Sequence, residues 1–165
     1  MKKTLIIILI IISSCASSKQ QRSLIDQQAD KIDEINQLNS STFDLGKYFE
    51  KEKGTFTIST HNNELKKIII DSRMNNDQNT ITIFIKKNQP FLIRQNLVSI
   101  LKLYKDDGNV ETQDLKSKTD FYISNWKREN YYKYIPNGFS EIPNEYQFKK
   151  EMIDKIILEF ANRTN

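Results

Sequence analysis

Thr55-Phe56-Thr57-Ile58-Ser59-Thr60 and Ile81-Thr82-Ile83-Phe84-Ile85-Lys86 are the stretches of sequence that decide the fold. Apolar residues recur at alternate positions in both, and a period of two is typical of a strand with one buried face. Residues 65–72 are rich in β-branched side chains and predict another strand between them. The joints at 61–64 and 75–79 are short and polar, which suits hairpin turns. Short joints connect antiparallel neighbours, so we expect an antiparallel meander.

Further along the chain, Pro90 is expected to end the strand that contains residues 81–86. Residues 91–104 fit a helix or a strand equally well. The Asp107-Gly108 pair is typical of a hairpin turn, and it leads into a candidate strand at 110–115. We therefore predict a hairpin here. Two more strands are expected at 120–126 and 131–135.

A final helix is predicted after Pro143, with Asn144 as its N-cap and Gln147 three residues later. Its inward stripe comprises Tyr146, Lys149, Met152, Ile153, Ile156, Ile157 and Phe160. A helix with such a stripe needs a sheet to cover.

Before the strands, residues 24–38 have apolar side chains at steps of three and four, which predicts an amphipathic helix. Two interpretations stay open: a short coiled-coil stalk that dimerises the protein, or a helix packed on its own domain. Residues 39–42 break the pattern. The predicted fold is α+β, an antiparallel β-sheet meander flanked by an N-terminal and a C-terminal helix, with the sheet and last helix forming one domain over 43–165.

The chain begins with the pattern of a secretory signal peptide. Lys2 and Lys3 precede an apolar run at residues 5–12, and Ile12-Ser13-Ser14-Cys15 closes the segment. The run is less than half of the roughly 20 residues that a membrane-spanning helix needs.

Ile12-Ser13-Ser14-Cys15 resembles the lipobox of bacterial lipoproteins, and the resemblance covers only this leader. It implies that residues 1–14 are removed and that Cys15 becomes the first residue, carrying a diacylglyceryl group and an acyl chain. Residues 15–23 would then be a lipidated tether. Ala16 stands where many inner-membrane lipoproteins have aspartate, so the resemblance implies the outer membrane, or the cell surface where there is one membrane. The alternative is an ordinary cleavage site beside an unused thiol.

Charge and composition limit the function classes. The net charge is +4, and without Lys2 and Lys3 the mature chain has 23 basic and 21 acidic side chains. That balance is not a nucleic-acid signature, so no nucleic-acid partner is expected. Cys15 is the only cysteine, which leaves the mature domain without a disulfide.

The chain offers little for catalysis. Four glycines cannot make a phosphate-binding glycine-rich loop, and His61 is the only histidine. Ser99-Ile100-Leu101-Lys102 matches a Ser-x-x-Lys acyl-enzyme pattern, but in a strand the serine and lysine point to opposite faces. We expect no enzyme activity, no metal and no cofactor beyond the covalent lipid on Cys15.

One cluster combines aromatic and basic side chains: Tyr122, Trp126, Lys127, Arg128, Tyr131, Tyr132, Lys133 and Tyr134. Tyr, Trp and Arg are typical of binding hot spots, although tyrosines are also ordinary strand residues that could pack under the final helix. We expect a lipid-anchored, non-catalytic domain of the bacterial cell envelope that binds an envelope or foreign protein, as an assembly factor or an immunity-type inhibitor. The alternative is a carrier that holds an apolar or lipid ligand in a curved sheet.

Overall fold

A computed structural model describes residues 19–50, 52–74 and 77–163. The chain forms two compact units, which divide after Ile35. The described part of the first unit is helical over residues 19–33, so the predicted N-terminal helix is confirmed. Its bounds differ from the prediction, because residues 19–23, predicted as part of the tether, are helical and the helix ends before residue 38. Its last turn tightens, because the Ile35 amide donates to the carbonyl of Ile32, three residues back.

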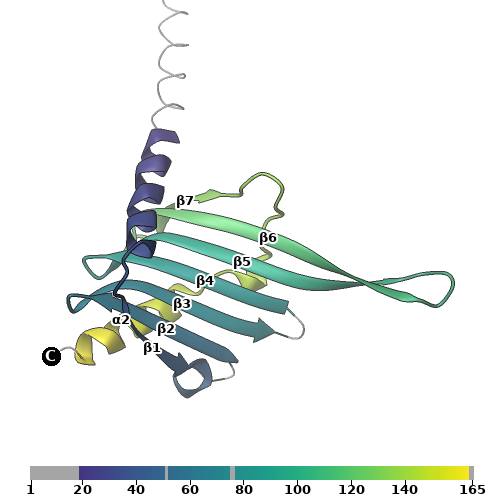
Figure 1. Ribbon diagram of the computed structural model, residues 1–165, viewed down its shortest axis with the longest axis horizontal. Helices are drawn as coiled ribbons and strands as arrows, with labels where there is room; N and C mark the ends of the chain where they lie inside the picture. Colours follow the sequence, from purple (N-terminus) through teal and green to yellow (C-terminus); the bar gives the residue numbers. More distant parts are fainter. Residues whose placement is uncertain (1–18, 51, 75–76, 164–165) are drawn as a thin grey trace, which may run out of the picture. The chain divides into compact units, whose positions relative to one another are not determined.

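The second unit contains a seven-stranded antiparallel sheet whose strand order follows the sequence from β1 to β7 (Figure 1). The strands are β1 (Asn39–Asp44), β2 (Gly54–His61), β3 (Glu64–Met74), β4 (Asp77–Lys86), β5 (Gln89–Tyr104), β6 (Val110–Asn125) and β7 (Asn130–Tyr134). Short 3-10 helices η1 (Leu45–Lys47) and η2 (Asn144–Tyr146) and the helix α2 (Lys150–Arg163) complete it. The predicted α+β class and meander are confirmed.

The alternating residues of the quoted stretches set the register of the sheet. Ile58, Ile68, Ile83, Ile93 and Phe121 lie opposite one another in a row across β2 to β6. Each is less than a tenth exposed, so this row is the centre of the core. A slip of one residue would turn the row to the other face, and burial therefore fixes the register.

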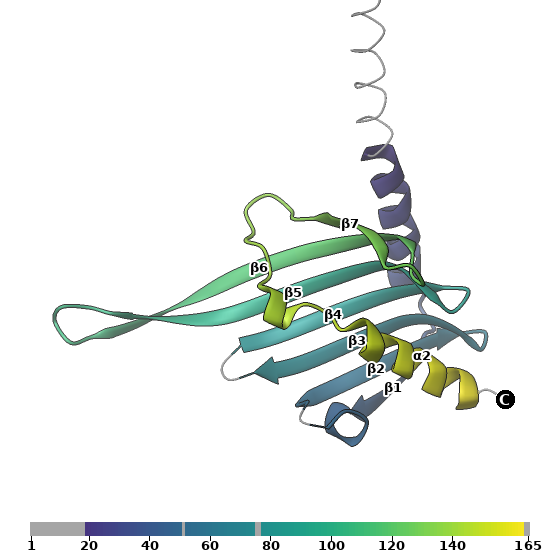
Figure 2. The ribbon, with the colours of Figure 1, turned by 180° about the vertical axis from the view of Figure 1, so that it is seen from behind.

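Helix α2 covers this face of the sheet, and Figure 2 shows it crossing β2 to β4. Ile153 and Ile156 are 0 % and 2 % exposed, while Met152, Ile157 and Phe160 pack against the core, as the predicted stripe requires. The helix begins at Lys150, so the prediction that Asn144 caps it was wrong. Asn144 starts η2 instead, where its side chain accepts a hydrogen bond of 2.9 Å from Gln147.

Three features of the sheet differ from the sequence prediction. Pro90, expected to end a strand, is the second residue of β5. Asn39–Asp44 forms the edge strand β1, although a break was predicted there, because hydroxyl pairs join it to β2: Ser40 to Ser59 and Thr42 to Thr57, each at 2.9 Å. The separate strands predicted at 110–115 and 120–126 are one strand, β6. Its polar middle remains regular because β5 pairs with it continuously.

Candidate functional site

The predicted lipidation residue, Cys15, and the lipobox around it lie outside the described residues. Within the described part of the chain, no helix is long and apolar enough to span a bilayer. The lipid anchor therefore stays a prediction from the leader sequence.

The aromatic and basic cluster is divided between the core and the surface. Trp126 is 6 % exposed and lies against Phe148, with ring centres 6.1 Å apart. Its indole nitrogen donates to Asp154 Oδ1 at 2.6 Å, and the Lys150 ammonium lies 5.0 Å from the ring centre. Tyr122 is equally buried, on the opposite face of β6. For these two residues, burial favours the packing interpretation of the sequence.

The other members of the cluster are more accessible, but they do not share one face. Lys127 and Arg128 are exposed in the turn between β6 and β7. Tyr131 is 40 % exposed on the α2 side, where its ring meets Phe121 and Phe148 edge-on. Tyr132 is 58 % exposed and, like the half-buried Tyr134, belongs to the other face. As a binding surface, the cluster is thus reduced to its exposed members.

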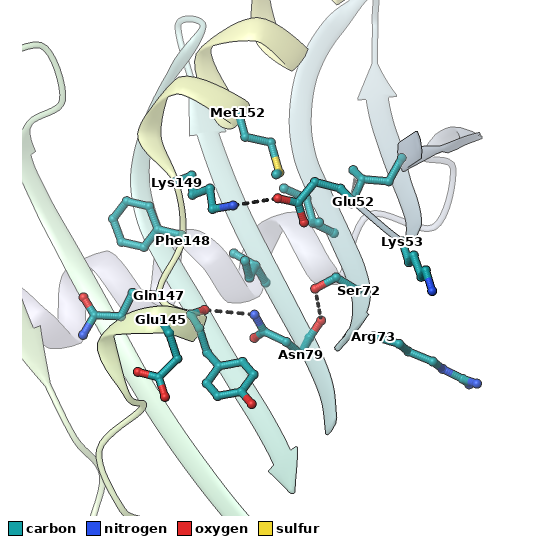
Figure 3. A pocket seen from close by; sticks show the side chains of 14 residues that line it. Glu52, Lys53, Ser72, Arg73, Asn79, Glu145, Gln147, Phe148, Lys149 and Met152 are labelled. Carbon is teal, nitrogen blue, oxygen red and sulfur yellow. Dashed lines mark hydrogen bonds and ion pairs between the residues drawn. The ribbon is translucent and has the colours of Figure 1, made fainter. Parts of the chain in front are cut away.

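A pocket of about 300 Å³ lies between the sheet and the segment that leads into α2 (Figure 3). Ile70 and Ile81 of the sheet and Phe148 and Met152 supply its apolar lining. Lys149 and Glu52 close one side with an ion pair of 2.6 Å, whereas Arg73 points away from the pocket.

Buried amides beside the pocket hold η2 against the sheet. Asn79 Nδ2 donates to the Tyr146 carbonyl at 3.0 Å, and Gln95 Nε2 donates to the same carbonyl and to Asn79 Oδ1. The Tyr146 hydroxyl donates to Asp77 Oδ2 at 2.5 Å, and this bond to a carboxylate raises the pKa of Tyr146 above 10.0. These polar groups are arranged to fix the η2 segment.

The residues considered for acid–base chemistry, His61, Ser99 and Lys102, lie on β2 and β5. His61 is the last residue of β2, beside the turn to β3, and its Nδ1 is 3.4 Å from the Gln37 carbonyl. Ser99 and Lys102 are three residues apart on β5 and point to opposite faces of the strand. Within the described ranges, no His, Cys, Asp and Glu side chains group closely enough to bind a metal ion.

The most exposed feature of the sheet is the hairpin of β5 and β6, which runs well past the neighbouring strands (Figures 1 and 2). Each of its strands has 16 residues, but pairing with β4 ends at Val98 and pairing with β7 begins at Asp120. We call residues 99–116 the arm. An isolated two-stranded ribbon is only marginally stable in water unless something packs against it.

The arm carries large apolar side chains in contact with solvent. Their exposed fractions are 45 % for Ile100, 47 % for Leu101, 40 % for Leu103, 78 % for Tyr104, 51 % for Val110 and 52 % for Leu115. Leu101, Leu103 and Leu115 lie on the α2 side of the ribbon, and the other three lie on the opposite side. Each face of the ribbon thus carries three large exposed apolar side chains, and exposed apolar patches are typical of protein-interaction sites.

The tip of the arm is polar and internally hydrogen-bonded. Gly108 adopts a φ of +81°, and its amide donates to the Lys105 carbonyl at 3.0 Å. The backbone amide and then the side chain of Asn109 donate to Asp107, and both bonds hold the pKa of that carboxyl below its usual range. Lys105 also forms an ion pair of 2.8 Å with Glu111. A charged tip does not suit insertion into a bilayer, whereas it can be solvated at the rim of a protein interface.

Sequence reasoning predicted this hairpin but did not predict that residues 99–116 extend past the neighbouring strands as an exposed arm. The sequence signal for the arm was the length of the apolar pattern, which continues to Tyr104. The resulting strand has 16 residues, whereas the preceding strand, which ends at Lys86, has 10. No protein-family model matches the chain, and no curated protein or solved structure matches it.

Proposed function

We propose that the protein is a lipid-anchored, non-catalytic binding domain of the bacterial cell envelope, an assembly factor or an immunity-type inhibitor that holds its partner with the arm. The observation that carries this proposal is the exposure of Leu101, Leu103 and Tyr104 on a ribbon that no other described strand supports. Leaving such side chains in water is unfavourable by about 25 cal/mol for each Å² of apolar surface. A partner that covers them gains this free energy.

The anchor supports the same role. Acylation of Cys15 would hold the domain at a membrane surface, because each methylene buried in the bilayer contributes about 0.8 kcal/mol. One acyl chain gives only reversible binding, whereas the several chains of a lipoprotein cysteine give stable attachment. The resemblance of the leader to lipoproteins, with Ala16 after the cysteine, favours the outer membrane over the inner one. The partner would then be a protein of the envelope or one that enters it.

The test compares two variants of the lipidated chain in envelope extracts made with mild detergent. Leu101→Lys with Leu103→Lys places charges on the apolar strand of the arm, whereas Leu158→Lys places one at an exposed leucine of α2, outside the arm. We expect the first variant to lose co-purified protein that wild type and Leu158→Lys retain. An unchanged set of co-purified proteins would contradict the proposal. Thermal unfolding at the wild-type temperature would confirm that both variants are folded.

The second candidate function is a carrier of an apolar or lipid ligand, and the pocket between the sheet and α2 is the observation in its favour. Its volume of about 300 Å³ reaches the lower end of small-molecule sites. Its walls mix Ile70 and Phe148 with the Lys149–Glu52 ion pair, which suits an acyl chain less well than an apolar cavity would. Mass spectrometry of an organic extract of the purified protein tests it: a bound lipid supports the carrier, and a clean extract argues against it.

A further inference from the structure

The chain has a single Asn-Gly pair, Asn137-Gly138, in the loop between β7 and η2. In Figures 1 and 2 this loop arches away from the sheet before it returns to η2. Both residues are exposed, and they form the middle of a turn that the Phe139 amide closes by donating to the Pro136 carbonyl at 3.3 Å. Gly138 has a φ of +83°, which glycine adopts readily at this position of a turn. The pair is therefore held in an accessible turn.

Both ends of the loop are fixed to β6. Before the loop, Tyr134 pairs with Asp120. After it, the Lys118 amide donates to the Ser140 carbonyl at 3.3 Å, and the hydroxyl oxygens of Ser117 and Ser140 lie 3.2 Å apart. A covalent change at the tip of the loop can therefore take place while the sheet stays paired.

The two groups that can react at this turn are not engaged elsewhere. Within the described part of the chain, neither the Asn137 side chain nor the Gly138 amide takes part in a hydrogen bond. An amide nitrogen and the preceding side-chain carbonyl carbon can close a five-membered ring, and such intramolecular reactions are strongly favoured over reactions between separate molecules. Glycine has no side chain to crowd this approach.

We propose that Asn137 is a site of spontaneous deamidation in the folded protein, with water as the only co-reactant. The Gly138 nitrogen attacks the side-chain carbonyl carbon of Asn137 and forms a new C–N bond. The C–N bond to the side-chain amide nitrogen breaks, and ammonia leaves with the proton from the Gly138 nitrogen. Water then opens the cyclic imide at its side-chain carbonyl, which gives aspartate, or at its main-chain carbonyl, which gives isoaspartate. No group is oxidised or reduced.

The Asp107-Gly108 pair at the tip of the arm shows how a similar turn is protected. Gly108 has a φ of +81°, but its amide already donates to the Lys105 carbonyl at 3.0 Å. The Asp107 carboxylate accepts hydrogen bonds of 2.9 and 2.8 Å from the backbone amide and side chain of Asn109. These bonds favour the charged carboxylate, which a nucleophile attacks poorly. At the turn after β7, by contrast, no described group engages the reacting atoms.

Deamidation would change the surface of the loop and leave the fold intact. It adds a negative charge and, in the isoaspartate form, lengthens the main chain at the tip. The tip has room for this change, because Phe139 is 42 % exposed and a Cβ added at Gly138 would meet nothing within 4 Å. We therefore expect the modified chain to unfold at the original temperature. This chemistry does not depend on the proposed function.

The test keeps the full purified chain folded in neutral buffer for days and then maps its tryptic peptides by mass spectrometry. Trypsin separates the two turns, since it cuts after Lys105 and Lys116 and after Lys133 and Lys149. We expect the peptide 134–149 to gain the mass difference between an amide and a carboxylic acid, and fragmentation should locate the change at Asn137. An isoaspartyl methyltransferase with a labelled methyl donor should mark the same peptide.

Two variants and one internal control accompany this experiment. Asn137→Gln keeps an amide but would have to close a six-membered ring, so it should react several-fold more slowly. The peptide 106–116, which holds Asp107 and Asn109, should gain neither mass nor label. Ion exchange should separate aged wild type into two forms, and the form that accumulates should elute with Asn137→Asp.

No conversion at Asn137 in the folded chain, or conversion only after unfolding in urea, would overturn the proposal. Equal conversion at Asn109, or isoaspartate at Asp107, would also overturn it, because hydrogen bonding of the reacting groups would then not select the site. A lower unfolding temperature for Asn137→Asp would contradict the claim that the modification leaves the fold intact.

Discussion

Trp126 joins the sheet to α2 through one side chain. Its ring stacks on Phe148, its indole nitrogen donates to Asp154 at 2.6 Å, and Lys150 lies over the ring at 5.0 Å. We expect Trp126→Ala to lower the free energy of unfolding by about 3–5 kcal/mol, because it removes a large buried side chain and leaves a cavity. Urea denaturation followed by circular dichroism measures this loss.

The matched variant is Tyr132→Ala, at a site that is 58 % exposed. We expect Tyr132→Ala to lower the free energy of unfolding by less than about 1 kcal/mol, the contribution of one cross-strand pair. Equal losses for the two variants would contradict the division of the aromatic cluster into core and surface. It follows that Tyr132, and not Trp126, is suitable for testing this cluster as a binding surface.

Because of the Tyr146–Asp77 hydrogen bond, the free energy of unfolding should fall at alkaline pH. The pKa of Tyr146 is raised above 10.0 by the bond to the carboxylate, so the folded state holds this proton more tightly than the unfolded state. The contribution is complete below pH 10.0 and is lost as pH rises through the folded pKa. We expect Tyr146→Phe to cost about 1 kcal/mol at neutral pH.

The measurement is the free energy of unfolding of both proteins at neutral pH and above pH 10.0. The difference between wild type and Tyr146→Phe should narrow at the higher pH, because other tyrosines titrate alike in both chains. A difference that stays constant or widens would show that the bond does not hold the proton.

At the scale of elements, the arm should be separable from the fold. Val98 and Lys116 lie opposite each other in the hairpin, so residues 99–115 can be replaced by an Asn-Gly turn that suits a tight hairpin. We expect the midpoint of thermal unfolding to change by only a few degrees, roughly the effect of 1 kcal/mol or less, because the removed side chains are exposed. Ile153→Ala, in the buried face of α2, should instead cost about 2–5 kcal/mol. A strong destabilisation by the shortened hairpin would show that the arm is part of the core.

The elements that sequence predicted are those with a local apolar period. Phe56 and Ile58, or Ile81 and Ile83, alternate with polar residues, and the row across β2 to β6 follows from that alternation. Strand β1 has no such period, since its stability comes from hydroxyl pairs with a strand that lies later in the chain. The η2 segment likewise depends on Asn79 and Gln95, which are distant in sequence.

At the scale of the whole molecule, the candidate site depends on where distant strands end. The residues of the arm are ordinary strand residues, and they form an exposed apolar surface only because β4 and β7 stop short of them. The burial of Trp126 likewise depends on a helix that begins 24 residues later, at Lys150. Local sequence patterns reveal neither where β4 and β7 end relative to the arm nor which helix covers Trp126. The sequence therefore indicated the aromatic cluster and not the arm.

The predicted lipid anchor on Cys15 can be tested in cells that make the whole chain. Cells grown with labelled palmitate should incorporate label into the wild-type protein, because the lipobox resemblance makes Cys15 the acylated residue. Cys15→Ser should carry no label. Label retained in that variant, or absent from wild type, would contradict anchoring through this sulfur.

Photo-cross-linking in living cells tests the binding role of the arm most directly. A benzophenone amino acid is placed at Tyr104 on the arm, at Tyr132 in the aromatic cluster, or at Leu158 on α2, all of which are more than half exposed. We predict a discrete protein adduct from position 104 that is absent from position 158 and disappears when Leu101→Lys and Leu103→Lys are added. Adducts from position 132 alone, or none from position 104, would contradict the central claim that this protein works by holding another protein with its arm.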